Sequence, residues 1–312
     1  IEEQHRASIQ VRQIFTVPMV IPEEITFPPT HIGNRKFAWG ERTFVMGVVN
    51  ATPDSFSGDG ALRSMSDVQA AVAQALRMED EGADIIDIGG ESTRPTSVYP
   101  DAVPVEGNDE IARVVPVIEG LADRLGIPIS IDTRKAEVAE AAVRAGAVLA
   151  NDVSMLGDEG MAGVIARTGV PIVVSHIRQG GHKGEVVQDV LNDLGAAVDL
   201  LVMAGVDRSN IIADPGIGFA KNTGQSLELM KYLGMLRSDI ELPVLVGSSR
   251  KSFIGAVTGE SVEDRRFGTA AAVALSIRGG ADIVRVHDVK EMVRVAKMSD
   301  AIVRGSGQSG HG

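Results

Sequence analysis

Two kinds of hydrophobic pattern alternate along most of the chain. Short runs rich in Val and Ile place apolar residues on consecutive positions, which is typical of parallel strands buried on both faces. Between the runs, apolar residues recur every three or four positions, as in residues 185–203, which predicts helices with one apolar face. The pattern predicts eight strands, at residues 44–50, 84–89, 128–132, 148–151, 171–176, 210–214, 243–248 and 282–287.

A repeated phrase marks the expected helix ends. It consists of a Gly followed by two residues that lead into the next apolar run. Glycine just past a helix end adopts the left-handed conformation at least cost. The phrase therefore predicts that each helix stops and turns directly into a strand. It begins at Gly82, Gly126, Gly146, Gly169, Gly205 and Gly280.

Eight strand–helix units predict an α/β protein with a (β/α)8 TIM barrel, which we place at residues 39–304. An open, doubly wound sheet is the alternative. Its dinucleotide fingerprint, a Gly-rich turn after the first strand, is missing.

The two ends of the chain do not follow the strand–helix rhythm. Residues 1–38 contain four prolines that break any long helix, so we expect a partly irregular N-terminal extension. Residues 31–37 and 43–48 flank Trp39 and Gly40 and are expected to form a hairpin that caps the N-terminal mouth of the barrel. Residues 305–312, rich in Gly and Ser, are expected to be a flexible tail.

Composition narrows the possible chemistry. The chain has no Cys, which excludes disulfides, thiolate catalysis and thiolate metal sites. A net charge of −12 argues against a nucleic-acid partner. No apolar run approaches the roughly 18 residues of a membrane helix, and no secretory signal pattern is seen at the start. We therefore expect a cytoplasmic protein that acts on small molecules, without a membrane.

Polar side chains follow the carboxyl end of every expected strand, the face where barrel enzymes carry their active sites. Single Asp and Asn residues there are often helix caps, but Asp132, Asn151 and Asp214 end runs expected to be buried. Buried charge must be paired or hydrogen-bonded. A nitrogen-rich heterocycle could donate to these carboxylates and accept from the amide.

Other strand-end residues favour an anion and an aromatic group. Several cations converge in a barrel and would bind phosphate or carboxylate. Asn50 is placed to give a Mg²⁺ ion its one protein oxygen, whereas His176 is expected to be structural. Phe56 and Phe219 stand in Gly-rich loops and favour an aromatic ligand. The cations are Arg94, Arg250, Lys251, Arg285 and His287.

Seven segments resemble, in order, the motifs of the dihydropteroate synthases, a family of pterin-binding enzymes. The likeness runs from about residue 39 to about residue 304. It implies a transferase of folate biosynthesis, a sulfonamide target, that condenses p-aminobenzoate with 6-hydroxymethyl-7,8-dihydropterin diphosphate and releases pyrophosphate. It also implies Mg²⁺ as cofactor and a homodimer. The segments are residues 46–57, 87–95, 130–133, 151–154, 214–219, 249–253 and 285–288.

The resemblance also implies residue roles. For the pterin it implies Asp132, Asn151, Asp214, Lys251 and Arg285. For p-aminobenzoate it implies Phe56, Thr93, Pro95, Phe219, Lys251 and Ser252. For the diphosphate it implies Asn50, Thr93, Arg94, Arg285 and His287, with Asn50 as the metal ligand. The expected catalytic residues are Lys251, Arg285, His287, Arg94 and Asp59.

Two departures from the family pattern alter these expectations. Gly58 stands where the family commonly has Asp, so the first-loop carboxylate is expected from Asp59. Ser175 and Ile177 stand where the family commonly has Met, which changes the wall under the pterin.

Three other functions share parts of this pattern. A corrinoid methyltransferase that uses methyltetrahydrofolate would have the same pterin pocket. An aldolase would form a Schiff base on Lys251. A pterin-binding module would have no activity.

Overall fold

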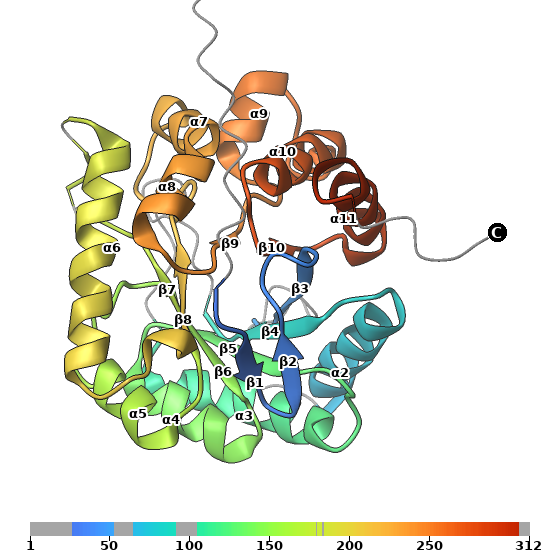
Figure 1. The fold of residues 1–312 in the computed structure, drawn as a ribbon. Coiled ribbons are helices and arrows are strands. Elements are labelled where there is room, and N and C mark those ends of the chain that lie inside the picture. Colours follow the sequence, from blue (N-terminus) through green and yellow to red (C-terminus); the bar gives the residue numbers. More distant parts are fainter. Residues whose placement is uncertain (1–26, 53–64, 92–104, 179, 183, 306–312) are drawn as a thin grey trace, which may run out of the picture.

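The computed structural model describes residues 27–52, 65–91, 105–178, 180–182 and 184–305. Within these ranges, eight parallel strands form one sheet that curls into a nearly closed barrel with helices around its outside (Figure 1). Going round the barrel, the strand order is β8-β7-β6-β5-β4-β3-β10-β9. The strands are β3 (Phe44–Asn50), β4 (Ile85–Gly89), β5 (Ile129–Thr133), β6 (Leu149–Asp152), β7 (Ile172–Ser175), β8 (Ile211–Asp214), β9 (Leu245–Val246) and β10 (Ile283–Val286).

The helices lie between the strands along the chain and cover the outer face of the sheet (Figure 1). None of those in the described ranges has the length and hydropathy needed to cross a bilayer. They are α2 (Met65–Asp80), α3 (Gly107–Ala122), α4 (Ala136–Ala145), α5 (Met161–Thr168), α6 (Val186–Met203), α7 (Thr223–Lys231), α8 (Leu233–Ile240), α9 (Ser252–Thr258), α10 (Arg266–Arg278) and α11 (Val289–Val303), with a 3₁₀ turn at Arg208–Asn210.

All eight predicted strands are present, and the barrel is confirmed over the open sheet. Five of the six glycines in the repeated phrase have positive φ. Gly126 is the exception, because α3 already ends at Ala122. The strand β9 is shorter than predicted, with only Leu245 and Val246 paired to β10. At its start, Pro243 has no N–H to offer a ladder, and its carbonyl instead accepts from Ala213 of β8.

Two apolar layers hold the barrel together. The larger layer lies between the sheet and the helices. The smaller one fills the barrel and takes one large side chain from most strands, such as Met46, Leu149 and Ile283. Because this inner layer is packed solid, polar side chains can gather only beyond it, at the carboxyl ends of the strands.

A small hairpin packs against the inner layer, but its pairing differs from the prediction. Strand β1 (Thr30–Ile32) pairs with β2 (Arg35–Phe37) around a turn at Gly33, where φ is +60°. Residues 43–48, the predicted second arm, belong instead to the barrel strand β3. Phe37 and Trp39 pack with Phe44 and interior side chains. The predicted cap is therefore present, built from a shorter hairpin.

Candidate active site

Arg285 lies at the centre of a buried polar cluster at the carboxyl ends of the strands. From β10, its Nε donates to Asp87 Oδ2 of β4 at 2.6 Å, and its Nη2 donates to Asp132 Oδ2 of β5 at 2.5 Å. Asn151 of β6 donates from Nδ2 to the same Asp87 oxygen at 3.0 Å. Four strands thus place two carboxylates, an amide and a guanidinium in mutual contact.

This cluster keeps three oxygens without a protein partner. Asp87 Oδ1, Asp132 Oδ1 and Asn151 Oδ1 are all buried and accept no hydrogen bond from the described part of the chain. Buried acceptors are normally satisfied, because leaving one unpaired costs about 1–3 kcal/mol. Together they match a ligand that presents several N–H donors.

Burial also sets the protonation of the cluster. Removal from water raises the pKa of Asp132, and the nearby positive charge of Arg285 offsets part of that rise. For Arg285, burial lowers the pKa, but Asp87 and Asp132 raise it by more, so the guanidinium remains charged. The site therefore holds a fixed positive charge beside carboxylates that are poorly solvated.

A second group of residues, from β7, β8 and the loops after β8 and β9, adjoins the cluster. Asp214 Oδ1 accepts from the Gly216 main chain at 2.8 Å, and its Oδ2 accepts from Ser175 Oγ at 3.0 Å. Burial raises the pKa of Asp214. The Lys251 ammonium lies 3.5 Å from the centre of the Phe219 ring. Burial lowers the pKa of Lys251 to about 8, with Asp214 opposing and Arg285 adding to the decrease.

Two of the residues expected to bind the anion, His287 and Arg250, contact neighbouring side chains in the structure. His287 Nδ1 lies 3.0 Å from Ser249 Oγ. Burial and then Arg285 lower the pKa of His287 to about 4, so its imidazole is neutral near pH 7 rather than a cation. Arg250, in the left-handed region at φ +58°, donates from Nε and Nη2 to the two oxygens of Asp288 at 3.1 and 2.7 Å. Its Nε and Nη2 are therefore paired with Asp288 in this structure.

Asn50 and Ser252 stand where the sequence placed them. Asn50 ends β3, beside Gly89 of β4, and is partly exposed. Within the described ranges, its carboxamide has no hydrogen-bond partner. Ser252 is the first residue of α9, directly after Lys251. The remaining predicted site residues lie outside the described part of the chain: Phe56, Asp59, Thr93, Arg94 and Pro95.

Sequence reasoning did not single out Asp87, although a signal was available. Asp87 is a charged residue within an apolar run and two positions before Gly89, so both are expected on one face of β4. The interpretation of His176 as structural is consistent with its contacts, because it is fully buried and its Nε2 lies 3.0 Å from Asp193. Ser175 contacts Asp214, so the replacement of the family's Met brings a hydroxyl donor there.

Comparison with known proteins gives a consistent result. Residues 46–287 match the model of the family described as pterin binding enzyme. The dihydropteroate synthase of Bacillus subtilis is 47% identical over 278 residues, covering 89% of this chain and 94% of that protein. The Xanthomonas albilineans dihydropteroate synthase with 4-aminobenzoic acid superposes with a TM-score of 0.81 at 41% identity, covering 88% of this chain and 98% of that one. The same enzyme in complex with 7,8-dihydropteroate gives a TM-score of 0.78 at 40% identity, covering the same shares of the two chains.

Proposed function

The chain belongs to the dihydropteroate synthases of the pterin-binding enzyme family, and we propose that its barrel mouth joins p-aminobenzoate to 6-hydroxymethyl-7,8-dihydropterin diphosphate. It is a transferase of folate biosynthesis. The observation that carries the residue assignment is the cluster of three unpaired acceptors around Arg285. The edge of a pterin ring carries N–H groups, and these oxygens can accept hydrogen bonds from them.

We assign the pterin to Asp132, Asn151 and Asp214, with Asp87 as an additional contributor that holds Arg285 and Asn151 in place. The guanidinium of Arg285 supplies a planar cation beside the ring. Because these groups come from adjacent strands of a rigid barrel, they are ordered before the ligand arrives, which lowers the entropic cost of binding.

We assign p-aminobenzoate to the neighbouring wall formed by Phe219, Lys251 and Ser252. The contact between the Lys251 ammonium and the Phe219 ring supports this placement. It puts an aromatic face and a positive charge side by side, which suits a ligand with an aryl ring and a carboxylate. The solved relative with 4-aminobenzoic acid is consistent with such a ligand in this fold.

The reaction forms one bond and breaks one. The amine nitrogen attacks the methylene carbon on the pterin, the carbon–oxygen bond to diphosphate breaks, and the amine loses one proton. An aryl amine is already neutral near pH 7, so no strong base is needed. The protein holds the two substrates in line and stabilises the departing negative charge. Arg285 contributes positive charge, and His287 contributes a neutral N–H.

The residues present fit a Mg²⁺ ion held mainly by the substrate. No group of three or more His, Asp or Glu in the described ranges could hold a metal, but the unpartnered carboxamide of Asn50 offers one hard oxygen. Mg²⁺ usually keeps waters and phosphate oxygens alongside one or two protein ligands. When bound, it would neutralise the diphosphate as that group leaves.

Product formation from the two substrates tests the activity directly. We expect dihydropteroate and pyrophosphate in equal amounts, and loss of both after divalent metal is removed by a chelator. Turnover that persists without divalent metal would exclude the metal assignment alone. Absence of product with both substrates and Mg²⁺ present would exclude the activity itself.

We further propose that the enzyme is a cytoplasmic homodimer. Helices α10 and α11 pack side by side and expose large apolar residues, which favours a protein partner over solvent. Phe267 is 83% exposed. Replacing Phe267 and Leu275 by Asp should give a monomer in light scattering, whereas Asp at the exposed Met203 of α6 should not. A parent protein that is monomeric at micromolar concentration would contradict the proposal. The exposed apolar residues are Phe267, Leu275, Met298 and Ile302.

A further inference from the structure

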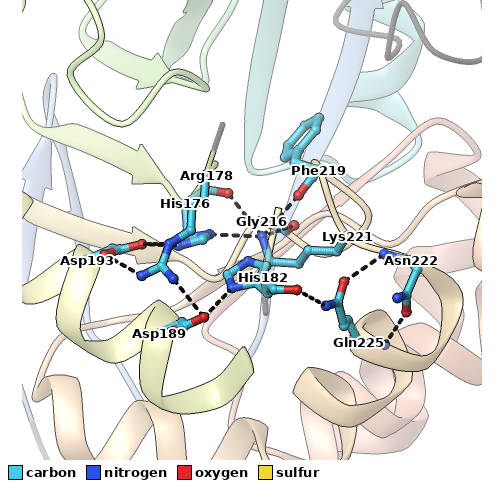
Figure 2. Close-up of polar contacts among 10 residues, drawn as sticks. All are labelled: His176, Arg178, His182, Asp189, Asp193, Gly216, Phe219, Lys221, Asn222 and Gln225. Carbon is cyan, nitrogen blue, oxygen red and sulfur yellow. Dashed lines mark hydrogen bonds and ion pairs between the residues drawn. The ribbon is translucent and has the colours of Figure 1, made fainter. Parts of the chain in front are cut away.

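The Nζ of Lys221 has four hydrogen-bond acceptors around it near the aminobenzoate wall, although no sequence motif drew attention to this residue. It lies between β8 and α7, two residues after Phe219 (Figure 2). Its Nζ lies 2.9 Å from His176 Nδ1, 3.0 Å from the Gly216 carbonyl, 3.1 Å from the Phe219 carbonyl and 3.3 Å from the His176 carbonyl. Burial lowers the pKa of Lys221 to about 7. An ammonium has three N–H donors and a neutral amine has two, so these four acceptors can occupy every donor in either state.

The tautomer of His176 makes Lys221 the required donor. Asp193 contacts three N–H groups: Arg178 Nε at 2.8 Å, Arg178 Nη2 at 2.9 Å and His176 Nε2 at 3.0 Å (Figure 2). The hydrogen bond from Arg178 lowers the pKa of Asp193, so this carboxylate can only accept. His176 must then carry its proton on Nε2, which leaves Nδ1 as an acceptor. Burial lowers the pKa of His176 to about 4, so the ring is neutral near pH 7.

The acceptors of Lys221 come from two separate segments. His176 directly follows β7, whereas Gly216 and Phe219 belong to the loop after β8. These segments are already in close contact, because a Cβ on Gly216 would lie 1.9 Å from the His176 carbonyl. The carbonyls of His176 and Gly216 both point to the Nζ of Lys221, at 3.3 and 3.0 Å. Lys221 therefore joins the two segments by donating hydrogen bonds to both.

The loop that Lys221 ties down carries the ring of the proposed aminobenzoate wall. The main chain of Phe219 is bonded to Lys221, and its ring lies against the Lys251 ammonium. Gly218, at φ +79°, packs against the Lys251 side chain, which a Cβ would approach to 3.1 Å. A shift of the loop would therefore move Phe219 and Lys251 together.

We propose that Lys221 is a positioning residue for the aminobenzoate half of the reaction, acting through the main chain of Phe219 and anchored by His176 and Asp193. The inference rests on the proposed placement of p-aminobenzoate at Phe219. Lys221 itself touches neither substrate. Its effect is expected to be larger on p-aminobenzoate than on the pterin, because Lys221 contacts the Phe219 main chain directly. Of the proposed pterin residues, it is linked only to Asp214, through the Gly216 main chain.

The first test compares Lys221→Met with Lys231→Met, a control on an exposed lysine of α7. We expect Lys221→Met to raise the KM for p-aminobenzoate about tenfold, the equivalent of one lost charged hydrogen bond. The KM for the pterin diphosphate should stay within about twofold, as for a surface change. If both KM values rise together, or neither changes, the proposal is wrong.

A double variant separates positioning from a general loss of structure. Phe219→Ala removes the ring through which Lys221 is proposed to act. Adding Lys221→Met to Phe219→Ala should then raise the KM for p-aminobenzoate little further, because coupled residues are not additive. Full additivity of the two changes would overturn the proposed route. If Lys221→Met does not fold, Lys221→Gln, which keeps two N–H donors, replaces it in the same comparison.

A measurement without substrates keeps this inference distinct from the proposed function. Hydrogen exchange of the amides in residues 214–222 should accelerate in Lys221→Met and not in Lys231→Met, while exchange in α2 and α11 stays unchanged. Unchanged exchange in residues 214–222 would refute the anchoring role whatever the activity. Faster exchange in a protein whose parent makes no dihydropteroate would instead contradict the proposed function and leave the anchor standing.

Discussion

Replacing Asp87 by Asn tests whether the buried cluster is organised for a ligand or only for stability. Asp87 is fully buried and accepts from both Arg285 and Asn151 through one oxygen. Asn keeps the shape and one acceptor but loses the charge opposite Arg285. Both partners are proposed to contact the pterin, so the change should affect stability and binding together.

The structure sets the expected size of both effects. Removing one partner of a buried ion pair costs about 3–5 kcal/mol when the remaining charge is left alone. Arg285 retains Asp132 at 2.5 Å, so the smaller cost of one charged hydrogen bond applies, about 1.5–3 kcal/mol. With Arg285 and Asn151 both less constrained, we expect the Kd for 6-hydroxymethylpterin to rise about 10- to 100-fold.

Asp282→Asn is the matched control. Asp282 and Arg237 form a second buried pair at the opposite end of the barrel, with Asp282 fully buried and 5% of the Arg237 side chain exposed. Urea unfolding should show Asp282→Asn destabilised at least as much as Asp87→Asn, because Arg237 has no second carboxylate partner in the described part of the chain. Calorimetry should show weaker pterin binding only in Asp87→Asn. Equal pterin affinity in Asp87→Asn and the parent would refute the assignment of this cluster to the pterin. Equal weakening in Asp282→Asn would show that binding only follows stability.

Three further variants have distinct expected results. Gly216→Ala should lower the free energy of unfolding by about 3 kcal/mol or more, because the added Cβ would meet main-chain atoms. Gly169→Ala, whose Cβ would face open space, should cost about 1 kcal/mol. Equal losses would contradict this. Lys251→Met should abolish turnover yet raise the melting temperature at pH 7. Burial lowers the pKa of Lys251 to about 8, from 10.5 in the unfolded chain. Charged Lys251 therefore destabilises the fold below about pH 8, and this cost fades by about pH 10. A lower melting temperature of Lys251→Met at pH 7 would refute this reasoning. Asp214→Asn should weaken pterin binding by about 1.5–3 kcal/mol in calorimetry and p-aminobenzoate binding much less; equal losses would remove Asp214 from the pterin pocket.

The fold was predictable because its strands are buried on both faces, so their apolar runs stand out without knowledge of tertiary contacts. Strand β3 spans the predicted residues 44–50. The hairpin was mispaired for the same reason. Residues 43–48 look equally suitable for a hairpin arm or a barrel strand, and only the partners β4 and β10 decide between them.

The site was predictable where a side chain ends a strand and not where its role depends on a distant partner. Asp132, Asn151 and Asp214 follow from position alone. Arg250 has the residue type of an anion ligand, but Asp288, 38 residues later, takes its guanidinium. Lys221 looks like a solvated loop lysine, because its acceptors are main-chain carbonyls, which no side-chain pattern records.

The strand pairing of the barrel is least extensive between β8 and β9. Between β8 and β9, the described residues form a single isolated bridge, from Ala213 to Val244 just before β9, whereas β4, β5 and β6 are joined by continuous ladders. The loops after β8 and β9 carry Phe219 and Lys251, and the continuous side carries Asp87, Asp132 and Asn151. The barrel can widen between β8 and β9 without breaking the hydrogen bonds of a continuous strand ladder. We therefore expect the enzyme to accept broader replacements for p-aminobenzoate than for the pterin. A series of ring-substituted analogues of each substrate would show this as a wide range of accepted amines against a narrow range of pterins, and equal ranges would contradict it.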